Sequence, residues 1–233
     1  MAKTKLRWEF PTTIETIEVQ EPQMTVRNCL HGYDEQGNLR KVLYCTRDGR
    51  FYVRYEDGWH EQKPCTNLVR RGRKKAPASA GGNFDVLYLR NPQLCLTVKC
   101  YRLVAYSWCE HPEAAKTDPE WYKYGHGFEV DHLNGDHNDS SPENLQWVTT
   151  EENRRRAGLA RRMRKIGLQP KWIFYRNLRG IFRLTPEQFE HFLAALQLAM
   201  RTNADDPLTI ANINIEVAII LDEMGCKGIL PNP

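Results

Sequence analysis

A short strand, a turn-rich loop, a second strand and a helix start follow one another in the middle of the chain, and this order constrains the fold most. Residues 128–130 are typical of a strand, and they end at Asp131-His132. Residues 133–143 are rich in Asn, Asp, Gly, Ser and Pro, which favour tight turns. Residues 145–148 alternate like a second strand. The Thr149–Glu152 spacing is that of a capping box, so a helix is expected to begin there.

Three side chains in this segment have the chemistry that phosphodiester hydrolysis needs. Adjacent strand residues point to opposite sides, so the Asp131 carboxylate can face a metal while the His132 imidazole reaches the phosphate from elsewhere. A neutral imidazole is suited to take a proton from water. Asn153 lies one turn into the expected helix, where its amide oxygen could complete the metal shell near a helix N-terminus that favours phosphate.

The same residues resemble a known family. The runs Val130-Asp131-His132-Leu133-Asn134-Gly135-Asp136, Pro142-Glu143-Asn144-Leu145-Gln146-Trp147-Val148-Thr149 and Glu152-Asn153 resemble the HNH endonucleases. The likeness is closest to the phage and intron-encoded, homing-type branch, in which the third signature position is Asn rather than His. Residues 101–105 also look like the helix that precedes the motif in that branch, although its usual His is Tyr101 here. The resemblance covers about residues 84–156.

This resemblance implies a ββα-metal fold, one Mg²⁺ or Mn²⁺ per site, and nicking or double-strand cleavage of DNA. Carried over position by position, it makes Asp131 and Asn153 metal ligands and His132 the general base. Asn144 would pin the intervening loop and orient His132.

Each of these residues also has an ordinary structural interpretation. An Asp-His pair at a strand end is commonly a turn or a cap. Asn153 alone would be a helix-surface amide, and His126 and His137 are expected to be surface residues. Trp147 is expected in the core because alternate strand positions face inward.

Charge along the chain points to a polyanionic partner. The 33 Lys and Arg against 29 Asp and Glu give a net charge of only +4, but two runs are dense in cations. One is 70–75, and the other, 154–165, holds seven Lys or Arg among twelve residues. Such runs suit the phosphates of double-stranded DNA, although either run alone could be a solvated face or linker. The candidate DNA-binding residues are Arg70, Arg71, Arg73, Lys74, Lys75, Arg154, Arg155, Arg156, Arg161 and Arg162.

Composition excludes several other classes. With 41% hydrophobic residues and a mean hydropathy of −0.64, the chain has no stretch that could cross a bilayer and no apolar run after its first residues. We therefore expect no membrane partner and a cytoplasmic location in a bacterial or phage-infected host cell. Seven cysteines at irregular spacing, with no Cys-x-x-Cys pair, favour free, mostly buried thiols and no structural zinc.

The remaining segments complete an expected α+β architecture: a ββα-metal (HNH) nuclease core, a small β-rich N-terminal module and a C-terminal helical tail. The predicted divisions are a β-rich module over 1–69, a basic linker over 70–83, the nuclease domain over 84–168 and helices over 169–233. Asp48-Gly49 predicts a hairpin, residues 84–89 and 94–98 paired strands, and 101–108 a helix.

The helical tail is expected to contain two helices. One begins at Thr185-Pro186 and runs to about Met200, with an apolar face of Phe189, Phe192, Leu193, Leu196 and Met200. The other begins at Asp206-Pro207 and ends near Met224, with Gly225 just beyond it. Packing is the ordinary role of such faces, and protein binding or DNA clamping is the alternative.

Two functions compete with a nuclease at this point. The first is a DNA-binding protein whose HNH fold no longer cuts. The second is an RNA-directed or structural phage protein that uses only the basic runs. Because Asp131, His132, Asn144 and Asn153 are all present, the sequence favours the enzyme.

Overall fold

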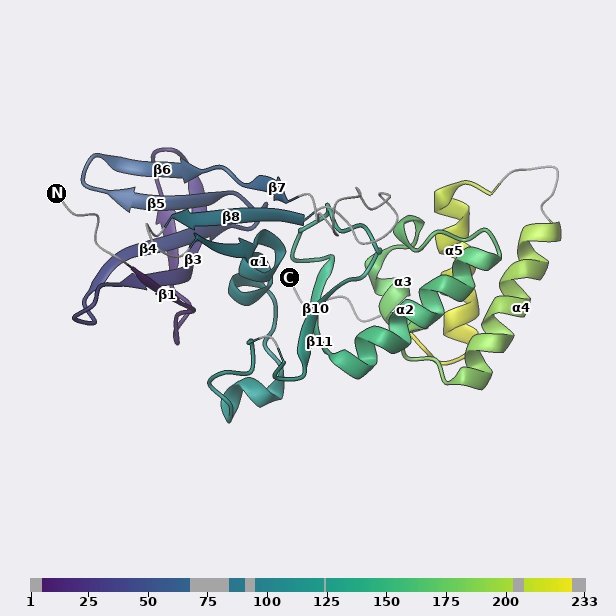
Figure 1. Cartoon of the computed structure of the whole chain (residues 1–233). Helices are drawn as coiled ribbons and strands as arrows, with labels where there is room; N and C mark the ends of the chain where they lie inside the picture. Colours follow the sequence, from purple (N-terminus) through teal and green to yellow (C-terminus); the bar gives the residue numbers. More distant parts are fainter. Residues whose placement is uncertain (1–5, 68–83, 91–94, 124, 203–207, 228–233) are drawn as a thin grey trace, which may run out of the picture. The chain divides into compact units, whose positions relative to one another are not determined.

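The chain divides into two units, the first built mainly of strands and the second mainly of helices (Figure 1). The computed structural model describes residues 6–67, 84–90, 95–123, 125–202 and 208–227. The first unit, called the N-terminal unit below, comprises residues 1–130 and 137–147. The second, called the helical unit, comprises residues 131–136 and 148–233. The predicted basic linker over 70–83 lies outside the described residues, as do its five candidate DNA-binding residues.

An antiparallel sheet occupies the first part of the N-terminal unit. Its order is β1-β3-β4-β5-β6, with β2 also paired to β3. The predicted hairpin at Asp48-Gly49 is confirmed: it joins β4 to β5, and Gly49 has the φ of +81° that glycine adopts most readily. The strands are β1 (Arg7–Glu9), β2 (Thr16–Val19), β3 (Met24–Tyr33), β4 (Leu39–Thr46), β5 (Phe51–Tyr55) and β6 (Gly58–Gln62).

A second sheet and a helix complete this part of the unit. The sheet has the order β7 (Cys65–Asn67), β8 (Phe84–Arg90) and β9 (Cys95–Lys99), so the predicted pairing of residues 84–89 with 94–98 is confirmed. The helix α1 (Cys100–Trp108) follows β9 directly, as its apolar spacing predicts, and packs against β3, β4 and β8. A short 3₁₀ turn, η1 (Glu113–Lys116), follows α1.

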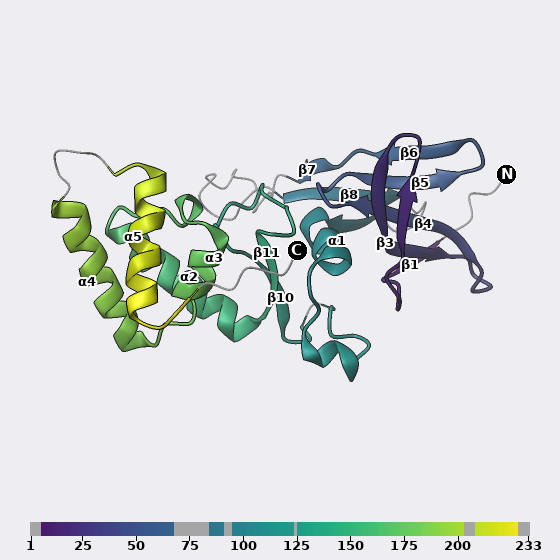
Figure 2. The same ribbon diagram turned by 180° about the vertical axis from the view of Figure 1, so that it is seen from behind.

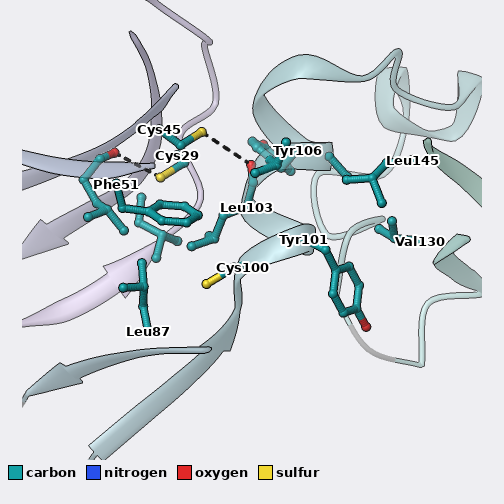
Figure 3. Close-up of a cluster of buried hydrophobic side chains, with 14 of the residues drawn as sticks. Cys29, Cys45, Phe51, Leu87, Cys100, Tyr101, Leu103, Tyr106, Val130 and Leu145 are labelled. Carbon is teal, nitrogen blue, oxygen red and sulfur yellow. Dashed lines mark hydrogen bonds between the residues drawn. The ribbon is translucent and has the colours of Figure 1, made fainter. Parts of the chain in front are cut away.

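The core of the N-terminal unit joins its sheet to α1 and to residues of the motif segment (Figure 3). Leu43 and Phe51 from the sheet, Leu103 from α1, and Leu145 and Trp147 belong to one buried cluster. Trp147 donates a hydrogen bond from its indole nitrogen to the Ala105 carbonyl at 3.1 Å, so the expectation that it is a core residue is confirmed. The segments before residue 69 and after residue 84, which are predicted as separate domains, therefore share this core.

The described thiols of both units are free, as the cysteine spacing indicates. Cys29, Cys45 and Cys100 are buried, while Cys109 and Cys226 are partly buried, and none of these five forms a disulfide. Figure 3 shows Cys29 donating a hydrogen bond to the Leu43 carbonyl, at 3.3 Å. Burial raises the pKa of the Cys29 thiol well above its ordinary value, which suits a structural and unreactive group.

The strand, loop, strand and helix predicted in the middle of the chain are present. β10 (Phe128–His132) and β11 (Leu145–Thr149) form a two-stranded sheet, and α2 (Thr150–Lys165) follows β11 without a break. The Thr149 hydroxyl accepts a hydrogen bond from the Glu152 amide at 3.1 Å, so the predicted helix cap is confirmed. The division between the two units runs through both strands, after Val130 and after Trp147.

Beyond α2 the helical unit contains η2 (Pro170–Trp172), α3 (Tyr175–Ile181), α4 (Pro186–Thr202) and α5 (Ile210–Glu223). The start of α4 is a complete capping box, because Thr185 and Gln188 each accept from the other's backbone amide, at 3.2 and 2.9 Å. The predicted start of the last helix, Asp206-Pro207, lies outside the described residues; α5 begins at Ile210, capped by the Thr209 hydroxyl. Its predicted end is confirmed, since Gly225 follows the cap with a φ of +68°.

The apolar faces of these helices are buried against one another, which confirms packing as their structural role. Phe189, Phe192, Leu193 and Leu196 of α4 lie in one core with residues of α3 and α5, and Met200 packs against it. Figures 1 and 2 show α4 and α5 side by side. The same core includes Met163 of α2, so the predicted boundary at residue 168 also separates segments that share a core. Among the described residues, no helix is long and apolar enough to span a membrane.

Candidate functional site

The Asp131-His132 pair lies at the end of β10 and is held in the helical unit by the residue that follows it. Leu133 is 2% exposed and belongs to the core that α2, α3, α4 and α5 share. The turn after the pair is closed by the Gly135 amide, which donates to the His132 carbonyl at 2.8 Å. Gly135 has a φ of +70°, a conformation that a residue with a side chain rarely adopts. The backbone that follows the pair is therefore fixed by core packing at Leu133 and by the turn at Gly135.

The two side chains of the pair differ in exposure. The Asp131 side chain is 16% exposed, whereas His132 is 5% exposed and its Nε2 atom is itself buried. The sequence predicts an imidazole that reaches a bound phosphate. In the structure the ring is enclosed, so a role as base requires that substrate binding open a path to it.

Asp131 contacts α2 through an ion pair with Arg156. Arg156 Nη1 lies 3.3 Å from Asp131 Oδ2, and Arg156 Nε donates to Glu152 Oε1 at 2.7 Å. The guanidinium lies 4.6 Å from the centroid of the Phe182 ring, and its side chain is only 11% exposed. Arg156 is a predicted DNA-binding residue, but here it joins two carboxylates inside the protein.

Asn153 lies on the same face of α2 as Arg156. It is the fourth residue of the helix and half-buried, and residues three apart in a helix are neighbours on its surface. Since Arg156 contacts Asp131, the end of β10 faces the part of α2 that carries Asn153. A carboxylate and an amide oxygen are ligands that hard cations such as Mg²⁺ accept. Among the described residues, no group of three or more His, Cys, Asp and Glu side chains could hold a metal ion. The predicted pair consists of one carboxylate and one amide, so it is not such a group.

Glu152 adds a second negative charge near Asp131. Partial burial opposes ionisation, but hydrogen bonds from Arg155 and Arg156 lower the pKa of Glu152 below its ordinary value. It therefore stays ionised at neutral pH and holds Arg156 in place. The capping-box spacing indicates Glu152 as a helix-start residue, whereas its side chain accepts hydrogen bonds from these two arginines.

Asn144 belongs to the N-terminal unit and stabilises the loop between the two strands. It is completely buried, and its Nδ2 donates to the Asp139 carbonyl at 2.7 Å. Its backbone amide also donates to the Ser141 carbonyl at 3.0 Å. These bonds agree with the loop-pinning role that the resemblance implies, while its action on His132 stays a prediction.

The predicted DNA-binding residues of α2 fall into two groups. Arg155 bonds Glu152 and the Phe182 carbonyl, and Arg162 pairs with Glu190 of α4, so both are used within the protein like Arg156. Arg154 and Arg161 are exposed and form no ion pair with any described residue. They lie seven residues apart on one face of α2, separated by Gly158, whose missing side chain would meet nothing within 4 Å.

Further exposed cations extend this basic surface beyond the predicted set. From residue 154 to residue 183 the chain has eleven Lys or Arg and no Asp or Glu. This lack of acids is the sequence signal that reasoning from the densest run alone overlooked. The additional exposed cations that form no ion pair within the described part of the chain are Arg164, Lys165, Lys171, Arg176 and Arg183.

Comparison with known proteins adds one finding to this geometry. Residues 122–155 match a family model described as HNH endonuclease, and this match spans β10, β11 and the first turns of α2. Asp131, His132, Asn144 and Asn153 all lie within it. No curated protein and no solved structure matches the chain.

Proposed function

We propose that this protein is a metal-dependent endonuclease that hydrolyses phosphodiester bonds of double-stranded DNA, and the match of residues 122–155 to an HNH endonuclease model supports this. The observation that carries the proposal is the contact of Asp131 with Arg156, at 3.3 Å. It brings the strand end that holds Asp131 and His132 to the helix face that holds Asn153. All three candidate residues thereby belong to one unit of the chain.

Asp131 and Asn153 would hold the cation, which supports charge neutralisation at the phosphoryl oxygens and at the leaving 3′-oxygen when it is bound. The oxygen chemistry of the pair and the partial exposure of the Asp131 side chain fit one Mg²⁺ or Mn²⁺. Arg156 orients the Asp131 carboxylate from the protein side, and Glu152 balances the guanidinium charge. The carboxylate is thus preorganised.

His132 acts as the general base of the proposed reaction. Its imidazole takes a proton from the attacking water, the oxygen of that water bonds to phosphorus, and the bond from phosphorus to the leaving oxygen breaks. Holding the backbone at Leu133 and Gly135 fixes the ring in position, and Asn144 keeps the neighbouring loop in shape. The enclosed ring excludes bulk water until substrate binds.

Arg154 and Arg161 would contact phosphates of the duplex next to the cleaved bond. Both are exposed on α2, whose first turn carries the candidate metal ligand Asn153, and neither forms an ion pair with a described residue. Contacts of this kind position DNA without reading its sequence. Since the site supplies one base and one cation, each cleavage event cuts one strand.

A second function is favoured by two observations. His132 is 5% exposed, and Asp131 is paired with Arg156, so this site could be a structural remnant in a DNA-binding protein that no longer cuts. That protein would bind the duplex through Arg154 and Arg161 and would leave it intact with or without metal.

A plasmid assay separates the two functions. Supercoiled DNA is incubated with Mg²⁺ or with EDTA, and with wild-type protein, His132→Ala or the control His191→Ala, which removes an exposed imidazole of α4. We expect metal-dependent nicking by the wild type and by the control, and a loss of about 10²-fold or more in His132→Ala. Plasmid that stays supercoiled with every metal tested, while still shifting in a gel, would establish the DNA-binding alternative instead.

A further inference from the structure

A pocket of about 490 Å³ lies in the helical unit. Its wall comes from η2, the start of α3, the start of α5 and the turn that follows the Asp131-His132 pair. We call it the aromatic pocket, and its principal residues are Asn134, Lys171, Trp172, Phe174, Tyr175 and Arg176. None of them has a role in the function proposed above.

An exposed aromatic ring is the most unusual feature of this pocket. Phe174 is 52% exposed, although three other aromatic residues of the helical unit, Phe182, Phe189 and Phe192, are buried in its core. The Arg176 guanidinium lies 5.9 Å from the Phe174 ring centroid. An exposed ring beside a cation offers a flat apolar face together with positive charge. Proteins bind single-stranded nucleic acids with this combination of groups.

A buried pair of amides holds this ring in place. Asn214 of α5, 3% exposed, accepts from the Phe174 amide at 2.7 Å and donates to the Trp172 carbonyl at 2.8 Å. Asn177 of α3, equally buried, donates to the Asn214 carbonyl at 3.1 Å. Buried polar networks of this kind rigidify the backbone they bond. The ring is therefore presented on a rigid turn, which lowers the entropy that binding costs.

The charge around the pocket selects the class of ligand. Lys171 and Arg176 are exposed and form no ion pair with any described residue, and both belong to the acid-free segment 154–183. A hydrophobic protein segment would need the ring but not the uncompensated cations. A base attached to a phosphate backbone uses both, because the base stacks on the ring while the phosphates meet the cations.

The pocket also shares a segment with the proposed nuclease site. Asn134 lies two residues after His132, and its side-chain oxygen accepts from the Asp136 amide at 2.7 Å, which fixes the turn. We propose that the aromatic pocket binds an unstacked base of the DNA strand close to the bond that is cut. This proposal rests on the proposed function for its position, and on the pocket itself for its ligand chemistry.

Binding of single-stranded DNA without metal tests the proposal. Fluorescence anisotropy is measured in EDTA with a labelled oligothymidylate of about 12 nucleotides, a length within the usual range for one binding site. The proteins are the wild type, Phe174→Ala, Phe174→Leu, Phe174→Tyr and the control Ile219→Ala, which truncates a comparably exposed apolar residue of α5. We expect affinity about tenfold lower in Phe174→Ala and in Phe174→Leu, and near the wild type in Phe174→Tyr and the control.

Other results would overturn the proposal. Wild-type affinity in Phe174→Ala would show that the ring takes no part in DNA binding. Wild-type affinity in Phe174→Leu would show that the pocket accepts any apolar shape, as a site for a protein segment or a second copy of the chain does.

The assay separates this proposal from the nuclease proposal. His132→Ala is expected to bind the oligonucleotide like the wild type, because the pocket needs no catalysis. Loss of binding in Phe174→Ala together with an uncut plasmid would remove the nuclease and keep a single-strand binding site. A cut plasmid with unchanged binding in Phe174→Ala would support the nuclease and remove the single-strand binding site.

Discussion

The two units of the chain carry the same net charge and distribute it differently. The N-terminal unit has 20 Lys or Arg against 18 Asp or Glu, and the helical unit has 13 against 11, so each has a net charge of +2. In the helical unit eleven of the thirteen cations lie between residues 154 and 183, with no acid among them. In the N-terminal sheet, Asp34 pairs with Arg40 and Asp48 pairs with Arg50, each within a single hairpin.

Asp34 and Arg156 illustrate what this difference means. Asp34 begins the turn between β3 and β4, where its carboxylate accepts from the Asn38 amide at 2.8 Å and from Arg40 at 2.6 Å. Those bonds serve local structure only. Arg156 instead reaches Asp131, 25 residues away in sequence, and so connects a strand end to the helix of the candidate site. Arg156 is thus used within the helical unit, whereas Arg154 and Arg161 of the same acid-free segment are exposed, form no ion pair with a described residue and are available to a polyanion.

The largest expected effect comes from the core that fixes the candidate site. Leu133→Ala removes a buried side chain from the helical core, and we expect about 3 kcal/mol less stability in that unit, because such truncations leave a cavity. Leu43→Ala in the other core should cost a similar amount. Urea unfolding followed by circular dichroism measures both. If Leu133→Ala were as stable as the wild type, the turn after His132 would not depend on the helical core.

The next effect concerns the cation that faces Asp131. Arg156→Gln removes a positive charge beside the proposed metal ligand and keeps a side-chain amide that can still donate to the Asp131 carboxylate, so Mn²⁺ affinity should rise about tenfold because like charges repel. The matched control is Arg162→Gln, which removes an ion-paired arginine of the same helix that contacts α4 instead. Calorimetric titration with Mn²⁺ provides the measurement. Equal affinities in the wild type and Arg156→Gln would mean that no cation binds next to Asp131.

A smaller effect is expected from the exposed cations of α2. The double variant Arg154→Ala/Arg161→Ala should weaken duplex binding severalfold and lower the slope of log affinity against log salt by about two, because two phosphates are then no longer neutralised by the protein. Arg54→Ala/Lys63→Ala, which removes two exposed cations of the N-terminal unit, should change the slope little. A larger drop in affinity for this second variant would reverse the contrast between the two units.

The smallest effect tests the internal use of charge in the N-terminal unit. Burial opposes ionisation of Asp34, but the Asn38 amide and Arg40 outweigh it and lower its pKa to about 2. A carboxylate whose pKa is lower in the folded state stabilises the protein above its unfolded pKa, and this stability is lost as the pH falls toward 2. Asp34→Asn should therefore unfold with less dependence on pH between about 4 and 2. Identical acid-unfolding curves for both proteins would refute this assignment.

Local sequence signals predicted several helix starts and a strand turn. The cap at Thr149, the capping box of Thr185 with Gln188, and the hairpin at Asp48-Gly49 depend on residues within four positions of one another. For such pairs sequence spacing nearly determines geometry. The helix face that contains Phe189 and Phe192 was predictable for the same reason.

Long-range partners could not be predicted in this way. Arg156 meets Asp131 across 25 residues and Arg162 meets Glu190 across 28, so only the fold reveals that these arginines are used internally. The shared core of Leu133 with the last helices is likewise a tertiary effect. α3 has no side-chain cap at its start, and Asn214, which orders the turn before it, lies in another helix.

Binding of one Mn²⁺ by Asp131 and Asn153 together is the central claim, and calorimetry on four proteins tests it most directly. We expect one ion per chain in the wild type, and weaker binding in Asp131→Asn and in Asn153→Ala. The double variant should be little weaker than the weaker single variant, because residues that share one ion are not independent. The isosteric Asn is chosen so that the turn beside Arg156 keeps its shape. Unchanged Mn²⁺ affinity in either single variant, or effects that add fully in the double variant, would contradict a shared ion at this site.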